Sequence, residues 1–405
     1  MRLARGLSAL RTIVKLAPNA TSSQVLPMIS SASSYLAIDD RLTVVEAAYV
    51  DRAWAERVLA DRPETHLHQL PYAGAAASGL DYLGGRPLDR VVAELGVRHV
   101  NYLRIANPAA AIPVLLGARR LLSHARIDII EIAEADAAVT VTTAAAALLE
   151  PFEFLQLPAS EKLNDLLLTP FGFNGVGVAF FGIHRRFVGA ILGGNREPDL
   201  GDLMANHGLS PRGIVQVGAH AGEEVASYLA LGFERILLVE AHPTLAADLA
   251  NRYAGEPRVA VAARAVSDAD GMVDLHLASS TVSSSILSIK RHAEVFPDIS
   301  ETAQIRVPAQ TLDGLLAERQ YAANAFNIAV IDIQGAELLA LRGATGLLQQ
   351  LEGLLVEINF AELYENCAQI EDIDDFLAAR GFVRVMTMSP YQSSYGDAFY
   401  LRTAV

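Results

Sequence analysis

The sequence predicts an α/β fold for its C-terminal half: a doubly wound, mostly parallel sheet with helices on both faces. From residue 207 onward, short apolar runs alternate with amphipathic runs of helical length, which is typical of strand–helix units. A two-glycine turn, Gly218 to Gly222, follows the first apolar run, and an acidic residue, Glu240, ends the second. These observations place a ligand crevice at the carboxyl ends of the strands.

Each expected strand of this half is a short apolar run, and each expected helix fills a stretch between two of them. We expect parallel strands at 214–217, 235–239, 259–266, 328–333 and 354–358, and a closing antiparallel pair at 382–388 and 398–401. We expect helices at 223–231, 244–253, 337–348 and 373–380. The remaining stretch, 277–308, is expected to be a long loop that forms a lid or a substrate shelf.

The length of 405 residues is sufficient for two domains. Residues 194–206 begin with the polar segment GNREPDLG and are expected to link a domain at 1–193 to the α/β domain at 207–405. The first domain is expected to be a degenerate, related α/β copy, because four of its segments recur in the same order in the second. The paired segments are 34–47 with 227–241, 88–95 with 312–319, 102–122 with 329–348, and 127–132 with 351–358.

In this alignment, the first domain shares the scaffold of the second but lacks most of the residues that are expected to be functional there. Gly218 and Gly222 align with Val25 and Ile29, and Asp332 and Glu337 align with Ala106 and Ala111. Glu46 aligns with Glu240. We therefore expect a first domain that holds no cofactor and packs on the second, with an unrelated α/β domain as the alternative.

Composition excludes several classes of partner. The net charge of −14 argues against nucleic acid, since phosphate contacts need a basic face. Cys367 is the single cysteine, which permits no intramolecular disulfide and fits a cytoplasmic protein. No run is long enough for a transmembrane span. Residues 1–15 read as an amphipathic helix, either docked on its own domain or held at a membrane surface.

The glycine turn is the first candidate for ligand binding. Such a turn directs free backbone N–H groups and the positive end of a helix toward an anion. Its G-x-x-x-G spacing differs from the G-x-G-x-x-G of dinucleotide binders and suits a cofactor without a pyrophosphate. In this class of fold, the anion is the carboxylate of the methionine part of S-adenosylmethionine. A tight turn with a purely structural role is the alternative.

Two acids complete the expected cofactor site. Glu240 suits the ribose hydroxyls, although it could instead cap the following helix, and Asp268 could accept from the adenine amino group, although D-x-D-G is also an ordinary turn. The expected cofactor-binding residues are Val217, Gly218, Ala219, His220, Gly222, Glu240, Ala241, Ser267, Asp268 and Asp332.

Three residues are the candidates for catalysis. Asp332 ends the fourth strand beside the switch point, where a carboxylate can orient or deprotonate an attacking hydroxyl. Its alternatives are a helix cap or a divalent-cation ligand, and we assign no metal site. Glu357, at the tip of the fifth strand, is its nearest expected partner. His292, in the long loop, is a candidate base at neutral pH, although a solvated role is the usual one for such a residue.

About 200 residues of this half resemble the FkbM family of methyltransferases. The resemblance is carried by VGAHAGEE, VEAHP, AVSDADG, SSSIL, IDIQGAELLALRGA, EINFAELYE and YGDAFYLR. It implies a Rossmann-like class I methyltransferase fold and methyl transfer from S-adenosylmethionine to oxygen, often on sugars, polyketides or similar metabolites. Many members of the family have Asn in place of His220 and Glu in place of Gln334. Because of these two departures, the resemblance does not define the acceptor or the general base of this chain.

The sequence therefore predicts an S-adenosylmethionine-dependent O-methyltransferase that acts on a small-molecule or glycan hydroxyl. The first alternative is a non-catalytic module that binds the cofactor or serves as a scaffold. The second is an NAD-dependent oxidoreductase, which fits the sheet but not the glycine spacing. Association of the chain with itself is left open.

Overall fold

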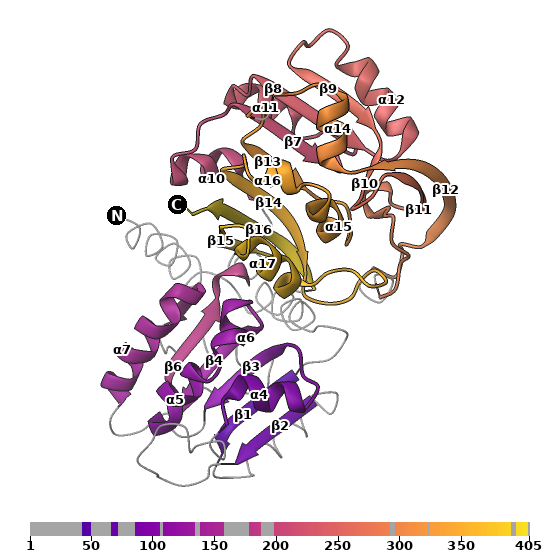
Figure 1. Cartoon of the computed structure of the whole chain (residues 1–405). Coiled ribbons are helices and arrows are strands. Elements are labelled where there is room, and N and C mark those ends of the chain that lie inside the picture. Colours follow the sequence, from indigo (N-terminus) through magenta and orange to yellow (C-terminus); the bar gives the residue numbers. More distant parts are fainter. Residues whose placement is uncertain are drawn as a thin grey trace, which may run out of the picture. The chain divides into compact units, whose positions relative to one another are not determined.

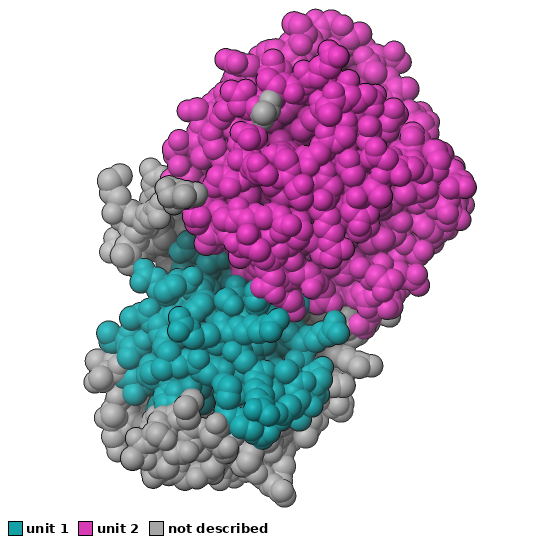
Figure 2. Space-filling view, viewed as in Figure 1, with its two compact units in different colours: residues 1–195, 389–393 teal, residues 196–388, 394–405 magenta. Residues whose placement is uncertain are grey.

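The computed structural model describes residues 43–49, 66–71, 86–105, 108–133, 138–157, 178–187, 198–291, 296–322, 324–389 and 394–403. The chain divides into two compact units (Figure 2), and each is described by itself. Unit 1 comprises residues 1–195 and 389–393, and unit 2 comprises residues 196–388 and 394–405. Unit 1 has a six-stranded sheet, and unit 2 has a seven-stranded sheet and a separate sheet of three strands.

The large sheet of unit 2 has the order β15-β16-β14-β13-β7-β8-β9 (Figure 1). Its strands are β7 (Gly213–Val217), β8 (Arg235–Glu240), β9 (Val259–Ala263), β13 (Ile328–Ile331), β14 (Gly353–Asn359), β15 (Phe382–Met388) and β16 (Tyr395–Arg402). Strand β16 runs antiparallel to both of its neighbours, and the other pairs are parallel. The predicted mostly parallel sheet with an antiparallel last strand is confirmed.

Both faces of this sheet are covered, since every residue of β7 and β14 is buried. The helices of unit 2 are α10 (Leu200–His207), α11 (Val225–Leu231), α12 (Pro243–Arg252), α14 (Leu312–Glu318), α15 (Glu337–Arg342), α16 (Thr345–Leu348) and α17 (Ile370–Ala378). Apolar side chains of α10, α11 and α12 pack in one cluster with alternate residues of β7, β8 and β13. The predicted doubly wound arrangement thus buries β-strands that read as continuous apolar runs.

The small sheet corrects the expectation of a long loop at 277–308. It has the order β10-β12-β11, with β10 (Ala265–Val266), β11 (Gly271–Ala278) and β12 (Glu301–Gln310). Strands β11 and β12 form an antiparallel hairpin, so only the stretch between them is irregular. The sequence of β12, ETAQIRVPAQ, is polar and contains a proline, and most of its first half is exposed. Its residues Ile305, Val307 and Ala309 alternate along the strand and pack with Leu275, which is a weaker signal than the continuous apolar run of a core strand.

Helix α10 corrects the expectation of a linker over all of 194–206. Leu200 and Met204, four residues apart, are buried on one face of this helix. The Asp199 side chain caps its N-terminus by accepting a hydrogen bond from the Asp202 N–H at 2.8 Å. In the described part of the chain, none of the helices combines the length and apolar character needed to cross a bilayer.

Unit 1 has a sheet with the order β2-β1-β3-β4-β6-β5. Its strands are β1 (Thr43–Tyr49), β2 (His66–Pro71), β3 (Val100–Ile105), β4 (Ile127–Ala133), β5 (Phe154–Leu157) and β6 (Val178–His184). Its described helices of four residues or more are α4 (Leu88–Glu94), α5 (Ala111–Leu116), α6 (Arg119–Ser123) and α7 (Ala138–Leu149). Strand β6 runs antiparallel to both β4 and β5, as β16 does to β14 and β15.

The two units share one tertiary detail at corresponding places. In unit 1, the Asp89 carboxylate accepts from the N–H groups of Arg120 and Leu121 at 2.8 and 3.0 Å, which caps the start of α6. In unit 2, Asp313 accepts from the N–H groups of Gly346 and Leu347 at 2.7 and 2.8 Å, at the start of α16. The backbone N–H of each aspartate also donates to a glycine carbonyl, that of Gly117 and that of Gly343. Both aspartates belong to segments that the sequence alignment paired.

The strand order corrects another part of that alignment. Strand β1 lies between β2 and β3, as β7 lies between β8 and β13, so β1 has the place of β7. The alignment had paired the residues of β1 with those of β8, and with them Glu46 with Glu240. Apolar runs rich in valine and alanine match one another by chance. Which strand of one unit corresponds to which strand of the other is decided only by its neighbours in the sheet. Val25, Ile29, Ala106 and residues 1–15 lie outside the described residues.

Candidate active site

The glycine turn after β7 lies against the end of β13. Gly218 has φ +84°, and a Cβ added there would lie 1.7 Å from the Asp332 carbonyl oxygen. The Asp332 N–H donates to the Val217 carbonyl at 3.0 Å, and the Gly218 N–H donates to the Val239 carbonyl at 2.9 Å. Gly218 is therefore required by a close approach of two backbones as well as by its left-handed conformation. This contact brings the expected cofactor turn and the expected catalytic aspartate together.

Glu240, at the end of β8, ties the same turn to the second strand. Its carboxylate is buried and accepts from the N–H of His220 at 2.8 Å and from the N–H of His242 at 2.7 Å. Burial raises the pKa of Glu240, and these two backbone hydrogen bonds oppose the rise. A carboxylate has about four lone-pair sites, so these bonds leave acceptor capacity for the ribose hydroxyls that the sequence predicted here.

The remaining expected cofactor residues surround this turn and the next strand end. Val217 and Ala219 are buried in the core, and Ala241 packs against the small sheet. Gly222 has φ +75°, and a Cβ added there would lie 2.6 Å from the side chain of the buried Leu249. Ser267 is buried and its hydroxyl lies 3.4 Å from an oxygen of the exposed Asp268. Asp268 thus faces solvent just beyond β10, where its expected role toward adenine stays a prediction.

His220 occupies the turn in a left-handed conformation, with φ +43°. One ring nitrogen lies 2.9 Å from a Glu223 carboxylate oxygen, and the other lies 2.8 Å from the Thr281 hydroxyl. The ring therefore connects the glycine turn to the segment that follows β11. With both nitrogens engaged, the interpretation of His220 as a turn residue beside the cofactor, rather than a catalyst, is the one that its contacts support.

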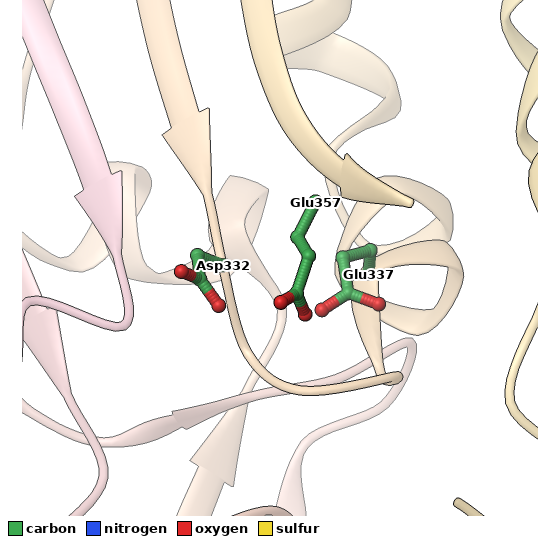
Figure 3. Close-up of side chains that lie close together, drawn as sticks. All are labelled: Asp332, Glu337 and Glu357. Carbon is green, nitrogen blue, oxygen red and sulfur yellow. The ribbon is translucent and has the colours of Figure 1, made fainter. Parts of the chain in front are cut away.

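Three carboxylates gather where β13 and β14 end (Figure 3). Asp332 follows β13, Glu357 lies in β14, and Glu337 is the first residue of α15. One oxygen of each lies within 4.8 Å of one oxygen of both others. Figure 3 shows Glu357 between the other two side chains. Glu337 and Glu357 are buried, whereas Asp332 is exposed.

Burial and mutual repulsion perturb both glutamates. Burial raises the pKa of Glu337 to about 7, and the charge of Asp332 adds to the rise. Burial also raises the pKa of Glu357 well above its usual range, with further contributions from Asp332, Glu337 and Asp397. One oxygen of Glu337 accepts from the N–H groups of Ile333 and Gly335, both at 3.0 Å. Its other oxygen is buried and accepts no hydrogen bond among the described residues.

Gln334 lies within this carboxylate group. Its side-chain nitrogen donates to Asp332 Oδ1 at 2.8 Å and to Glu357 Oε1 at 3.0 Å. The hydroxyl of the buried Tyr364 lies 2.9 Å from Gln334 Oε1. The expected partnership of Asp332 with Glu357 is therefore present, and it runs through an amide that the sequence analysis noted only as a departure from the family.

The segment after β11 closes over the same turn. Ser285, buried, donates from its hydroxyl to the Gln334 carbonyl at 2.8 Å. The Tyr364 hydroxyl also lies 3.1 Å from the Ser283 carbonyl. Lys290 pairs with Glu362 at 2.9 Å. His292, the third catalytic candidate, lies outside the described residues.

Sequence reasoning missed Glu337 and Tyr364 as site residues. A glutamate in the first turn of a helix ordinarily lies in solvent, where its charge interacts favourably with the helix dipole. Its burial depends on how α15 packs, which the sequence does not reveal. A spacing of five residues between Asp332 and Glu337, across a turn containing Gly335, was the one available signal.

The strand order and the glycine turn beside an acidic strand end define a class I methyltransferase fold. Within unit 2, residues 216–384 match the methyltransferase FkbM domain. These residues thus form an FkbM methyltransferase domain, and the resemblance found in the sequence is confirmed for them. None of the curated proteins matches the sequence.

Solved structures of methyltransferases are also similar to the chain, at low identity. A methyltransferase FkbM from Methylobacillus flagellatus KT is 14% identical, with 98% of this chain and 99% of that chain covered and a TM-score of 0.35. The magnesium protoporphyrin IX methyltransferase from Synechocystis PCC 6803 is 9% identical over 50% of this chain and 76% of its own, with a TM-score of 0.30. The 1,6-didemethyltoxoflavin-N1-methyltransferase from Burkholderia thailandensis is 17% identical, with the same coverage and a TM-score of 0.29.

Proposed function

We propose that unit 2 transfers a methyl group from S-adenosylmethionine to a hydroxyl oxygen of a small molecule or glycan. The contact between the Gly218 turn and the end of β13 carries this proposal. A methyl donor held with its amino-acid tail on that turn would have its reacting end toward Asp332. An acceptor held by Asp332 then lies next to the methyl group, and orientation of the two reactants supplies most of the rate.

The residues present divide the work in this proposal. The turn from Gly218 to Gly222 would hold the amino-acid tail of the donor, and Glu240 would receive its ribose hydroxyls. The exposed carboxylate of Asp332 accepts the hydrogen of the acceptor hydroxyl and orients its oxygen for in-line attack. The C–S bond of the donor breaks as the C–O bond forms, and the hydroxyl proton passes to the carboxylate. S-adenosylhomocysteine and a methyl ether are the products.

Unit 1 is proposed to be a degenerate copy of the same fold. The shared aspartate caps at α6 and α16 and the matching antiparallel strands β6 and β16 support this proposal. At the position that aligns with Glu337, unit 1 has Ala111, also the first residue of a helix. We therefore assign no cofactor to unit 1.

The test is transfer of a labelled methyl group from S-adenosylmethionine into a panel of glycans and hydroxylated metabolites. Product analysis then separates methyl ethers from N- and C-methylated products. A second measurement is the affinity for S-adenosylhomocysteine of wild type and Glu240→Gln. We expect the variant to bind about tenfold more weakly, because one carboxylate oxygen becomes a donor that faces other donors. Methyl groups found only on nitrogen or carbon would overturn the assignment to oxygen.

Gly218 variants would not make this test. A side chain at Gly218 collides with the Asp332 backbone whether or not a cofactor binds. A Gly218→Asp substitution, which sequence alone suggests, would thus lose binding through loss of fold. Glu240→Gln keeps the size of the side chain and introduces no such collision, although its amide nitrogen replaces one acceptor of a backbone N–H, so its binding is compared together with its thermal unfolding.

A further inference from the structure

The side-chain amide of Gln334 lies between two of the three carboxylates that could hold a cation. Asp332, Glu337 and Glu357 are oxygen ligands of the type that divalent cations prefer, and their oxygens lie within 4.8 Å of one another. No lysine or arginine pairs with Glu337 or Glu357 in the part of the chain that the structure describes. Instead, the Gln334 amide nitrogen gives one hydrogen bond to Asp332 and one to Glu357.

We infer that Gln334 is a positioning residue whose amide replaces a cation between Asp332 and Glu357 and fixes the orientation of the Asp332 carboxylate. This inference rests on the proposed function, because Asp332 is the acceptor-binding carboxylate there. A neutral amide presents two polarised N–H groups without a net charge. It can therefore satisfy two carboxylates at once, whereas a bound cation would have to displace the amide nitrogen from both.

Other contacts fix which end of the amide faces the carboxylates. The Tyr364 hydroxyl lies 2.9 Å from Gln334 Oε1, and its single hydrogen is shared between that oxygen and the Ser283 carbonyl. Tyr364 is 1% exposed, so water does not compete for this contact. A flipped amide would direct its oxygen at two carboxylate oxygens and its nitrogen at the tyrosine. The observed orientation is thus strongly favoured.

The backbone around Gln334 is built to hold it. Gln334 has φ +57°, which is an uncommon conformation for a residue with a side chain. The Ser285 hydroxyl donates to its carbonyl, and Glu337 Oε1 accepts from the N–H groups on both sides of it, those of Ile333 and Gly335. A strained residue persists when its surroundings determine its conformation, and such residues cluster at functional sites.

The first experiment measures Mn²⁺ binding by electron paramagnetic resonance, with the full chain and without cofactor or acceptor. Gln334→Glu replaces the bridging amide with a fourth carboxylate, and Gln349→Glu adds the same charge at an exposed position outside the site. We expect Gln334→Glu to bind Mn²⁺ at least about tenfold more tightly than wild type and Gln349→Glu. Equal binding by wild type and Gln334→Glu would overturn the inference.

The second experiment separates positioning from folding. Gln334→Met keeps the length of the side chain but removes both donors, so the Asp332 carboxylate loses its fixed orientation. We expect kcat to fall about tenfold or more with KM and the S-adenosylhomocysteine affinity within about twofold of wild type. A wild-type kcat would overturn the inference. Absence of S-adenosylhomocysteine binding by the wild-type chain would instead refute the proposed function, and the Mn²⁺ result would stand apart from it.

Discussion

Both units bury carboxylates beside a central parallel strand, and they treat the charge in opposite ways. In unit 1, Glu131 on β4 has the Arg104 guanidinium at 3.0 Å and the Tyr102 hydroxyl as a donor. In unit 2, Glu357 at the aligned place on β14 has Asp332 and Glu337 as neighbours and only an amide as a donor from a described side chain. The first arrangement places a cation beside the buried acid, whereas the second raises the pKa of both buried glutamates.

A second buried acid in unit 1 follows the first arrangement. Asp128 accepts from Arg186 at 2.7 Å and from Asn101 at 2.9 Å, and it lies 2.8 Å from a ring nitrogen of His99. Burial lowers the pKa of His99, and the neighbouring Asp128 charge opposes that shift. Uncompensated buried carboxylates lower stability and cluster at functional sites. The comparison therefore contrasts paired buried acids in unit 1 with buried acids of raised pKa in unit 2.

Loss of the Asp332 carboxylate, the exposed member of the three-carboxylate group, should have the largest effect on activity. Asp332→Asn removes the proton acceptor but preserves the shape of the side chain. We expect methyl transfer to fall about a hundredfold to ten-thousandfold, with S-adenosylhomocysteine affinity within about threefold of wild type. Steady-state kinetics and calorimetry measure the two effects. Asp248→Asn, on the exposed face of α12, is the matched control, and unchanged turnover in Asp332→Asn would remove Asp332 from the mechanism.

Removal of the Arg104 guanidinium in unit 1 should affect the stability of that unit rather than cofactor binding by unit 2. Arg104→Met leaves the Glu131 carboxylate buried without its partner, which costs about 3 kcal/mol for a buried pair. We expect a lower free energy of unfolding for unit 1 in chemical denaturation, with binding of S-adenosylhomocysteine by unit 2 retained. Arg90→Met, which breaks an exposed pair with Glu94, is the control and should change stability by less than about 1 kcal/mol. An equal effect of both variants would contradict the comparison.

The pH dependence of stability should come from unit 2. The pKa of Glu337 is raised to about 7 in the folded chain, so the folded state favours its protonated form. The stabilisation from that proton is complete below the usual pKa of glutamate and is lost as pH rises through about 7. We expect the free energy of unfolding to fall across this window by up to about 1.4 kcal/mol per pH unit for one proton.

Glu337→Gln should remove the part of this slope that comes from Glu337, because its amide does not titrate and its oxygen can still accept from Ile333 and Gly335. Glu357, whose pKa is also raised, keeps its own contribution. Denaturant titrations between about pH 4 and pH 9 measure the slope, since it lies between the usual pKa of glutamate and about 7. Glu234→Gln, an exposed substitution, should leave the slope unchanged. A slope in Glu337→Gln equal to that of wild type would assign the pH dependence to other groups.

The smallest effect is expected at His220. Its left-handed backbone is tolerated by asparagine, and its ring contacts Glu223 and Thr281 near the surface. We expect His220→Asn to change turnover and S-adenosylhomocysteine affinity by less than about threefold, which corresponds to under about 0.7 kcal/mol. A large loss of kcat with intact binding would make His220 a catalyst and would change the division of roles in unit 2.

The sequence was sufficient for the parts of the site that depend on local pattern. The glycine turn, the acid that ends β8 and the aspartate that ends β13 each follow an apolar run, and parallel strands bring their carboxyl ends to one edge. The partnership of Asp332 with Glu357 follows from the same rule. The bridge through Gln334 does not, because a side chain two residues past a strand can point in several directions.

Other features depended on packing between distant segments. The burial of Glu337 needs α15 to lie against the sheet, and the Tyr364 contact joins residues 30 positions apart in the chain. The hairpin of β11 and β12 packs Leu275, Val307 and Ala309 in one small cluster. Its alternating apolar residues were therefore a signal that sequence reasoning missed, because a loop was expected in this stretch. In unit 1, the place of β1 was decided by its neighbours β2 and β3, which an alignment of apolar segments does not contain.

The most direct measurement is a calorimetric titration of the full chain with S-adenosylhomocysteine. We expect one binding site per chain, with affinity reduced in Glu240→Gln and retained in Asp332→Asn. One site is expected because residues 50–65, which follow β1, the strand that has the place of β7, contain no glycine and so no glycine turn. No heat of binding would contradict the methyltransferase site in unit 2, and two sites per chain would contradict the contrast between the units.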